Sequence, residues 1–257
     1  MKQDISIIIP ILNEAKVIGN LLEYLIENSS KKNIAEIIVV DGGSTDGTQE
    51  LFQDFVTSSA DEKSQKKDSE TSSGLVNKSK IVLINSPKGR AKQMNLGAKH
   101  AKGNILYFLH ADSLPPHNFD QHIIDKIEEG NKAGCFIMKF NSKHWWLKLA
   151  GILTRLPWKV ARGGDQSLFI TRNLFNTIGG YDERFTIYED NNLIGRLYAK
   201  NQFIVIQKWL ITSARRYEEK GLWRLQYHFW TIHLKNWLGA DAETLHQYYL
   251  KHVSVKK

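Results

Sequence analysis

The sequence contains one cysteine, Cys135, and no long uninterrupted apolar run. A single cysteine cannot form an intramolecular disulfide, so the composition gives no sign of an oxidising compartment. No apolar stretch approaches the about 20 residues that a membrane-spanning helix needs. The opening segment, MKQDISIIIPILNE, has no small-residue cleavage site after its apolar run, so we expect no signal peptide. These absences predict a cytoplasmic protein that is either soluble or attached to the inner face of the cell membrane.

Negative charge is also in deficit, because 35 Lys and Arg residues face 27 Asp and Glu residues, which gives a net charge of +8. A positive surplus favours an anionic partner, such as a nucleotide phosphate, an acidic membrane face or nucleic acid, and charge alone does not choose among them. The chain has 257 residues, of which 42% are hydrophobic, and this is enough to bury a core without a metal or disulfide.

What is present in the first half is a regular alternation of strand-like and helix-like segments. β-Branched runs predict strands at Ile5–Leu12, Ala35–Asp41, Lys80–Asn85 and Asn104–His110. Helical spacing of apolar residues covers 14–28 and 90–101, and Ser44 is a candidate N-cap for a helix between them. This alternation predicts an α/β fold of Rossmann-like type, with a mainly parallel central sheet flanked by helices.

The second half is less regular. Strands are predicted at 134–140, 167–171 and 203–207, and helices at 144–156, 173–178 and 188–200, with a helical tail at 218–252. The segment 57–79 is rich in Ser, Lys, Asp and Glu, and we interpret it as a surface loop insertion. We expect residues 1–215 to form the main domain, with 216–257 as a helical C-terminal extension packed on it.

Three of the predicted strands end in acidic residues. Glu14, Asp41 and Asp112 follow the first, second and fourth strands. One such acid alone is better explained as a helix cap, but ligands of open parallel sheets bind at the carboxyl ends of the strands. Three acids on one edge therefore favour a shared site. A carboxylate such as Asp112 suits Mg²⁺ or Mn²⁺, which proteins often hold together with substrate phosphates.

Two further groups are candidates for chemistry. Arg90 begins a predicted helix and is placed to pair with a phosphate, although a solvated helix start explains it equally well. Glu189 and Asp190 begin another helix, where acids are favoured in any case. Their functional interpretation is a general base that takes a proton from an acceptor hydroxyl, with neighbouring carboxylates raising each other's pKa.

Together, four segments resemble glycosyltransferase family 2, the inverting enzymes of the GT-A fold. IIIPILNE resembles the strand-one motif, and VVDGGSTDGT resembles the nucleotide-binding turn. GRAKQMNLGAKHAKGNILYFLHADSLPP resembles the segment leading into the metal-binding acid, and GGDQSLFITRNLFNTIGGYDERFTIYEDNNLIGRL resembles the acceptor and catalytic segment. Each motif is weak alone, but this order is specific, and the chain looks closest to a bacterial subfamily of short stand-alone members.

The resemblance implies roles for particular positions. The nucleotide-sugar site would be formed by Pro10, Asn13, Glu14, Asp41, Arg90, Gln93, Asn95 and Asp112. Asp112 would also be the metal ligand, in a motif shortened here to His110–Ala111–Asp112. Asp190 would be the catalytic base with Glu189 beside it, and Asp165 and Gln166 would lie near the acceptor or the transferred sugar.

The function implied is transfer of a sugar, with inversion, from a nucleotide-sugar to an acceptor hydroxyl, assisted by a divalent metal, Mg²⁺ or Mn²⁺. UDP is the family's commonest nucleotide, so we expect a UDP-sugar donor. Two alternatives are a nucleotidyltransferase and a nucleotide-sugar-binding protein without catalysis. Leu12–Asn13–Glu14 stands where the first would have a glycine-rich basic loop, and the acids at 112, 189 and 190 argue against the second. Nucleic-acid binding would leave the strand-end acids unexplained.

The tail combines aromatic and basic residues. Trp223, Tyr227, Phe229, Trp230 and Trp237 lie among Lys, Arg and His, as in helices that rest on anionic membranes. A lipid-linked acceptor would fit such peripheral membrane contact. The commoner explanation is an aromatic face packed on the domain or at a homodimer interface, and the sequence leaves these alternatives open.

Overall fold

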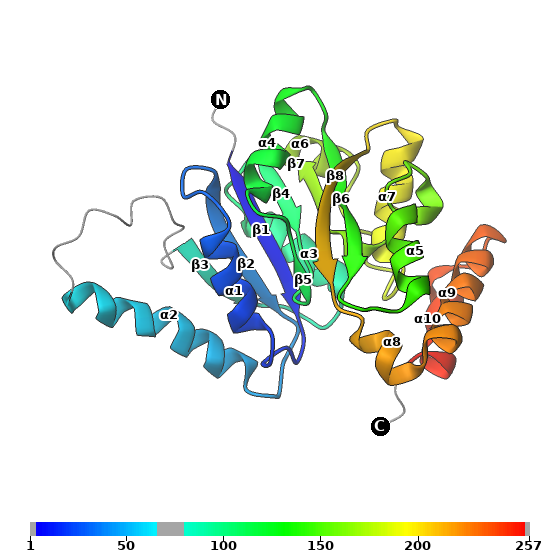
Figure 1. The fold of residues 1–257 in the computed structure, drawn as a ribbon, viewed down its shortest axis with the longest axis horizontal. Coiled ribbons are helices and arrows are strands. Elements are labelled where there is room, and N and C mark those ends of the chain that lie inside the picture. Colours follow the sequence, from blue (N-terminus) through cyan, green and yellow to red (C-terminus); the bar gives the residue numbers. More distant parts are fainter. Residues whose placement is uncertain (1–3, 66–79, 255–257) are drawn as a thin grey trace.

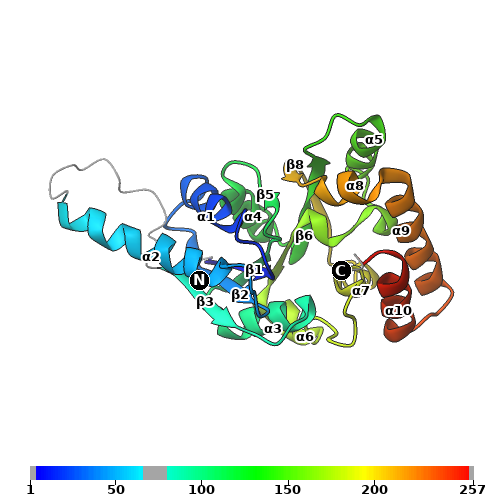
Figure 2. The same cartoon turned by 90° about the horizontal axis from the view of Figure 1, so that it is seen from below.

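The computed structural model describes residues 4–65 and 80–254. Its centre is one eight-stranded sheet in the order β3-β2-β1-β4-β7-β6-β8-β5, with helices on both faces (Figures 1 and 2). The prediction of an α/β fold with a mainly parallel sheet is confirmed, although the sheet is mixed. β7 runs antiparallel to β4 and β6, and β5 runs antiparallel to β8.

The N-terminal half supplies four neighbouring parallel strands of the sheet. Its strands are β1 (Ile5–Ile11), β2 (Ile34–Asp41), β3 (Ile81–Asn85) and β4 (Ile105–Phe108), and its helices are α1 (Ile18–Glu27), α2 (Thr48–Gln65) and α3 (Arg90–His100). β1 lies between β2 and β4, and all three point the same way. Helix α3 packs tightly on β1 and β2, because a Cβ on Gly97 would come within 2.5 Å of Ile8 Cγ2. Because β2, β1 and β4 are parallel neighbours, their carboxyl ends lie together at one end of the sheet.

The C-terminal half completes the sheet and covers it. Its strands are β5 (Ser113–Leu114), β6 (Ala133–Phe140), β7 (Leu168–Thr171) and β8 (Ile204–Thr212). Its helices before the tail are α4 (Phe119–Glu128), α5 (Trp145–Leu153), α6 (Arg172–Thr177) and α7 (Glu189–Ala199), with short turns η2 (Lys159–Ala161) and η3 (Gly164–Gln166). β6 and β8 pair in parallel beside the antiparallel β7. The loops that follow β4, β6 and β8 meet near α8 (Figure 1).

The core consists of two layers, one on each face of the sheet. Alternate residues of β1 point to opposite faces, as the two-residue period of a strand requires. Ile7 and Ile9 pack with α1 and α4 on one face, whereas Ile8 packs with α3 and α7 on the other. The strand residues in both layers are almost entirely inaccessible to solvent, so the sheet is a rigid base for the loops at its edge.

The tail forms three helices: α8 (Arg215–Lys220), α9 (Leu222–Trp237) and α10 (Ala242–His252). They share a small core of Leu225, Ile232, Leu245 and Val253, against which Phe185 of the loop before α7 packs. The boundary between domain and extension at residue 215 stays a prediction. None of the helices within residues 4–65 and 80–254 combines the length and the hydropathy that crossing a bilayer requires.

Several element predictions were wrong in detail. Helix α1 begins at residue 18 rather than 14, after a turn at residues 15–17 before which the Glu14 N–H donates to Thr48 Oγ1 and the Ala15 N–H to Asp46 Oδ2, each at 3.1 Å. Ser44 caps no helix, since its hydroxyl donates to Asp41 and α2 begins only at Thr48. The predicted loop at 57–79 is helical as far as Gln65, and residues 66–79 lie outside the described part. β5 was not predicted because it is only two residues long, and α4 was missed although Phe119, Ile123 and Ile127 have helical spacing.

Candidate active site

A pocket opens where β1 and β4 end, beneath the first tail helices. Its cavity volume is about 160 Å³. Five predicted site residues line it: Pro10, Glu14, Arg90, Asp112 and Asp165. The remaining lining residues are His110, Ala111, Ser213, Arg215, Arg216, Tyr217 and Phe229. The fold thus brings together residues from positions 10 to 229, with acids on the sheet side and arginines on the tail side.

Asn13 and Asp41 join the loops that follow β1 and β2. The buried Asp41 carboxylate accepts hydrogen bonds from the backbone N–H and the hydroxyl of Ser44, at 3.0 and 2.6 Å. Asn13 Oδ1 accepts from the Thr45 N–H at 2.8 Å, and the Asn13 N–H donates to Ser44 Oγ at 2.9 Å. In the structure these two residues fix the relative position of the loops and do not line the pocket. Their predicted place in the nucleotide-sugar site stays a prediction.

Glu14 and Asp112 place two carboxylates in the pocket, facing a guanidinium. Arg215 Nη2 lies 3.7 Å from Glu14 Oε2. Burial raises the pKa of Glu14, Arg215 opposes this, and the nearby charge of Asp112 raises it further. Because the two carboxylates repel each other, a positive charge near them is favoured. Arg215 supplies only part of that positive charge.

These donors fit a divalent cation that is shared with a substrate. Within the described ranges, no group of three or more His, Cys, Asp or Glu side chains is arranged to hold a metal by itself. Mg²⁺ and Mn²⁺ sites commonly use one or two carboxylates and complete their shell with phosphate oxygens and waters. Asp112, half-buried at the end of β4 with Glu14 nearby, provides that minimal set of oxygen ligands.

Arg90 is paired with Glu189 in addition to lining the pocket. Its Nε lies 2.6 Å from Glu189 Oε1, and the Glu189 side chain is fully buried. Burial raises the pKa of Glu189, Arg90 opposes this, and Asp190 raises it again. Glu189 in turn raises the pKa of Arg90, so the guanidinium stays charged. Arg90 was predicted to approach the base or the diphosphate, but its direct partner in the structure is an acid of the predicted catalytic pair.

His110 connects Asp165 with Asp190. Its Nδ1 lies 3.8 Å from Asp165 Oδ1, and its Nε2 lies 3.7 Å from Asp190 Oδ2. Burial is the main cause that raises the pKa of Asp190, with Asp165 adding to it and Arg90 opposing it. Burial and the charge of Arg90 lower the pKa of His110. Asp190 and Glu189 do not line the pocket themselves, and Asp190 lies behind His110 as a buried carboxylate of raised pKa, which is the property that a general base needs.

Backbone shape around Asp190 depends on Gly164. A Cβ at this position would lie 2.0 Å from Asp190 Oδ2 and 2.8 Å from His110 Cε1. At the adjacent Gly163, by contrast, an added Cβ would have no neighbour within 4 Å. The η3 turn therefore approaches Asp190 so closely that only glycine fits.

Three predicted binding residues have supporting contacts instead. Gln93 is buried, and its Nε2 donates to the carbonyls of Ile11 (2.7 Å) and Val40 (2.8 Å), which joins the ends of β1 and β2. Asn95 exchanges two hydrogen bonds of 2.9 Å with the backbone of Tyr181. Gln166 is buried and accepts from the Gly163 N–H at 3.2 Å. None of these three lines the pocket; their amides instead contact backbone groups, and within the described residues Gln166 Nε2 is buried without a hydrogen-bond partner.

The tail residues of the pocket were not predicted. Arg215 and Arg216 begin α8, and Tyr217 and Phe229 complete the wall. Arg216 is held over the Phe229 ring at 5.5 Å and donates to the Tyr249 hydroxyl at 3.0 Å. The adjacent arginines shortly after a strand were visible in the sequence. Their contact with Glu14 was not, because about 200 residues of sequence separate them.

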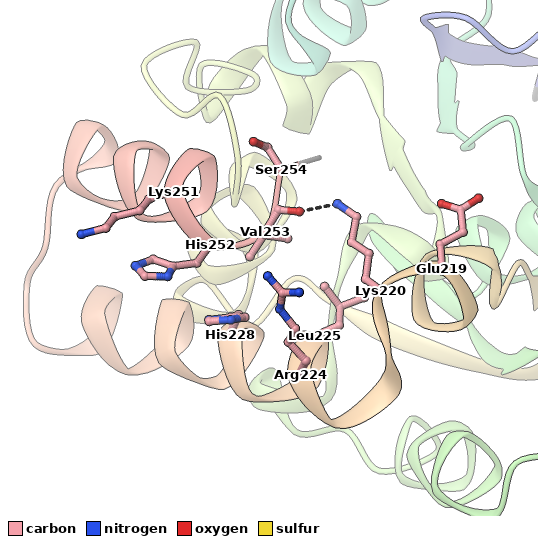
Figure 3. A pocket seen from close by; sticks show the side chains of 9 residues that line it. All are labelled: Glu219, Lys220, Arg224, Leu225, His228, Lys251, His252, Val253 and Ser254. Atoms are coloured by element: carbon pink, nitrogen blue, oxygen red, sulfur yellow. Dashed lines mark hydrogen bonds between the residues drawn. The ribbon is translucent and has the colours of Figure 1, made fainter. Parts of the chain in front are cut away.

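A larger cavity, of about 600 Å³, lies between α8, α9 and the end of α10 (Figure 3). Lys220 donates to the Val253 carbonyl across it, and Arg224 points in the same direction. Its one acid, Glu219, is directed away from the basic side chains in Figure 3. Because no strand-end residue and no predicted site residue line this cavity, the smaller pocket is the candidate active site.

Comparisons with known proteins agree with this geometry. A family model described as glycosyl transferase family 2 matches residues 6–188. A probable glycosyltransferase of Bacillus subtilis, YdaM, is 25% identical over 244 residues, which are 88% of this chain and 54% of that protein. A PGL/p-HBAD biosynthesis glycosyltransferase of Mycobacterium bovis is 30% identical over 84% of this chain and 77% of its own length. The chain thus spans about half the length of the Bacillus relative.

Solved structures share the fold at low sequence identity. The mannosyltransferase PcManGT of Pyrobaculum calidifontis, in complex with GDP-Man and Mn²⁺, has a TM-score of 0.65 and 18% identity, covering 98% of this chain and 71% of that chain. A TarS fragment of S. aureus with UDP has a TM-score of 0.61 and 16% identity, covering 82% and 60%. The fold is that of the GT-A glycosyltransferases. On the family match, the chain belongs to glycosyl transferase family 2, as the motifs predicted.

Proposed function

We propose that this chain transfers a glycosyl unit from a nucleoside diphosphate sugar to an acceptor hydroxyl, with inversion at the anomeric carbon. The observation that carries the proposal is the pocket at the ends of β1 and β4, where Asp112 and Glu14 face Arg215 and where Asp190 is reached through His110. A nucleoside diphosphate sugar needs both a cationic environment for its phosphates and a base on the acceptor side.

The roles in this proposal follow from position and charge. Asp112 would hold a divalent cation, Mg²⁺ or Mn²⁺, whose charge offsets that of the leaving diphosphate. Arg215 and Arg216 face the same space from the tail and would contact phosphate oxygens. Asp190 would accept the proton of the attacking hydroxyl on the face opposite to the diphosphate, which produces inversion. Arg90 would hold Glu189 beside it, and Asp165 would orient His110.

The donor that we propose is a UDP-sugar. Similar folds have been solved with UDP and with GDP-Man, so likeness of fold does not select the base. Calorimetric titration of the purified chain with UDP and GDP, each with and without Mn²⁺, tests the proposal. We expect binding of one nucleotide that is strengthened by Mn²⁺ in the wild type and not in Asp112→Ala.

A matched control is Glu219→Ala, which removes an acid outside the pocket and should leave the titration unchanged. If the folded wild-type chain bound neither nucleotide at any metal concentration, the proposed donor class would be wrong. If Asp112→Ala kept the full Mn²⁺ effect, the donor class would stand and the metal assignment would be wrong.

A further inference from the structure

One side of helix α9 carries an exposed apolar stripe. Its residues are separated by four, three, four and three positions, which places them on one face of a helix. They are Trp223, Tyr227, Trp230, Leu234 and Trp237. Trp237 is 80% exposed and Tyr227 is 61% exposed, whereas Leu225 and Ile232 on the opposite side are buried in the tail core. The helix is therefore apolar on two sides, and only one of them is covered.

Helix α5 continues this stripe. Its Trp146 ring lies 5.3 Å from Trp223 and 5.9 Å from Trp230, and Trp146 Nε1 donates to Gln226 Oε1 at 3.3 Å. Trp145 lies 6.1 Å from Trp223 and is 60% exposed. Further exposed residues of α5 are Leu149, Ile152 and Leu153. We refer to the exposed apolar residues of α5 and α9 as the aromatic face, and the two helices lie side by side in Figures 1 and 2.

The two segments that form the aromatic face contain basic residues but no acidic residue. Residues 131–164 contain seven Lys and Arg and no Asp or Glu, and residues 220–240 contain three Lys and Arg and no Asp or Glu. Lys143, Lys148, Arg155 and Lys159 are exposed around α5. The two segments thus carry positive charge and no negative charge of their own, and the nearest acids in the sequence of the second segment are Glu219 and Asp241 at its two ends.

We propose that the aromatic face docks on an anionic lipid bilayer. Trp and Tyr are suited to the headgroup region, because an apolar ring is joined to a polar tip, and Leu side chains reach below it. Lysines and arginines around them are attracted by anionic headgroups. A second copy of the chain fits less well, since two faces of the same positive charge would repel each other.

The aromatic face lies close to the pocket. Phe229, which lines the candidate active site, precedes Trp230 of the stripe, so one helix separates the pocket from the bilayer. A helix with its side chains is about 10 Å across. Resting on the proposed transfer function, we infer that the acceptor hydroxyl is carried on a membrane lipid, which enters the pocket beside α9.

Flotation of the purified chain with vesicles tests the docking. Vesicles of phosphatidylcholine alone are compared with vesicles that also contain phosphatidylglycerol, at low and at high salt. We expect binding to the anionic vesicles that weakens as salt screens the headgroup charge. Equal binding to both kinds of vesicle, or binding to neither by the folded chain, would overturn the proposal.

Substitutions on the face provide the sharper comparison. The double change Leu234→Ser/Trp237→Ser should weaken vesicle binding at least about ten-fold, and Lys148→Gln and Arg155→Gln about five-fold each. Leu51→Ser is the matched control, because Leu51 is 48% exposed on α2 and Leu234 is 54% exposed on α9. The control should bind vesicles as the wild type does. Wild-type binding by the double variant would contradict the proposal.

Two parallel measurements separate the remaining outcomes. If sedimentation velocity without lipid showed a dimer that Leu234→Ser/Trp237→Ser converts to monomer, the face would be an interface between copies and the proposal would be wrong. Nucleotide titration of the same variant should equal that of the wild type. If the chain bound vesicles but no nucleotide, the docking would stand. Only the proposed transfer function, and the acceptor inference that rests on it, would be wrong.

Discussion

The edge of the sheet and the helical tail are built in contrasting ways. At the sheet edge, functional side chains follow strands whose residues are almost wholly inaccessible, and acids such as Asp41 and Glu189 are buried. Up to residue 254, where the described part ends, the tail has only four buried hydrophobic residues of its own, and it exposes a row of aromatic ones. Burial at the sheet edge fixes positions and shifts pKa values, whereas exposure in the tail leaves surface for another molecule.

The two regions meet in the pocket, and each supplies what the other lacks. The strand ends provide Glu14 and Asp112, and the tail provides Arg215 and Arg216. A carboxylate positioned by a strand and an arginine positioned by a helix are joined only by tertiary packing. Changes at the sheet edge should therefore affect chemistry, while changes on the outer tail should affect association.

The largest effect is expected from Asp190→Asn, which removes the proposed base and keeps its shape. General-base catalysis contributes about 10²–10⁴-fold, so turnover should fall by that factor while donor affinity stays the same. Release of nucleoside diphosphate from the donor that calorimetry identifies measures turnover. Glu219→Gln, an acid of the tail outside the pocket, is the control. Full turnover in the Asp190 variant would show that another group takes the proton.

The next effect is expected from Gly164→Ala. The added Cβ would lie 2.0 Å from Asp190 Oδ2, so the carboxylate must move. Displacement of a catalytic group by about 1 Å can cost about 10²-fold in rate, and we expect a loss of that order. Gly163→Ala is the matched control, because its Cβ meets no atom within 4 Å. Equal rates in the two variants would contradict the assigned position of Asp190.

A smaller and graded effect is expected from pH. Burial raises the pKa of Asp190, and a base acts only when it is deprotonated. Turnover should therefore fall as pH decreases through this raised pKa, about ten-fold per pH unit below it, and reach a plateau above it. Because Asp190, Glu189 and His110 interact, the pKa that this profile reports belongs to the three groups together. If turnover stayed constant down to the pH at which an exposed aspartate is normally protonated, a raised pKa of Asp190 would be refuted.

The smallest effect is expected from Trp237→Ser on stability. Trp237 is 80% exposed, and surface changes usually alter the free energy of unfolding by less than about 0.5 kcal/mol. Leu21→Ala in the sheet core should cost about 2–5 kcal/mol, because it leaves a cavity. Urea unfolding of both variants measures the contrast. A loss of several kcal/mol in Trp237→Ser would mean that the aromatic face is part of the core.

Local patterns were sufficient for much of the fold. The β-branched runs and the helical spacing predicted β1, β2, β3, β4 and α3 to within one or two residues, because buried parallel strands have a strong signal. The helix expected at residue 14 begins at 18, after a turn whose start is joined by hydrogen bonds to Asp46 and Thr48. The two-residue strand β5 was not visible in the sequence, whereas α4 was missed despite the helical spacing of Phe119, Ile123 and Ile127.

Three of the five predicted residues that line the pocket lie at or soon after the end of a strand, whereas Arg90 came from its place at a predicted helix start and Asp165 only from the family resemblance. Pro10, Glu14 and Asp112 line the pocket, as the strand-end rule requires. Gln93 and Asn95 share their segment with Arg90, yet their amides hold backbone groups elsewhere, because helix rotation turns successive side chains to different faces.

By itself, the sequence determined the order of strands and helices, the family and the acids at the strand ends, because each is encoded in a few consecutive residues. The tertiary structure alone decided that Arg90 pairs with Glu189, that His110 links Asp165 with Asp190, and that Arg215 faces Glu14. These pairs join residues 55 to 201 positions apart, and only the packing of the whole chain brings them within reach of one another.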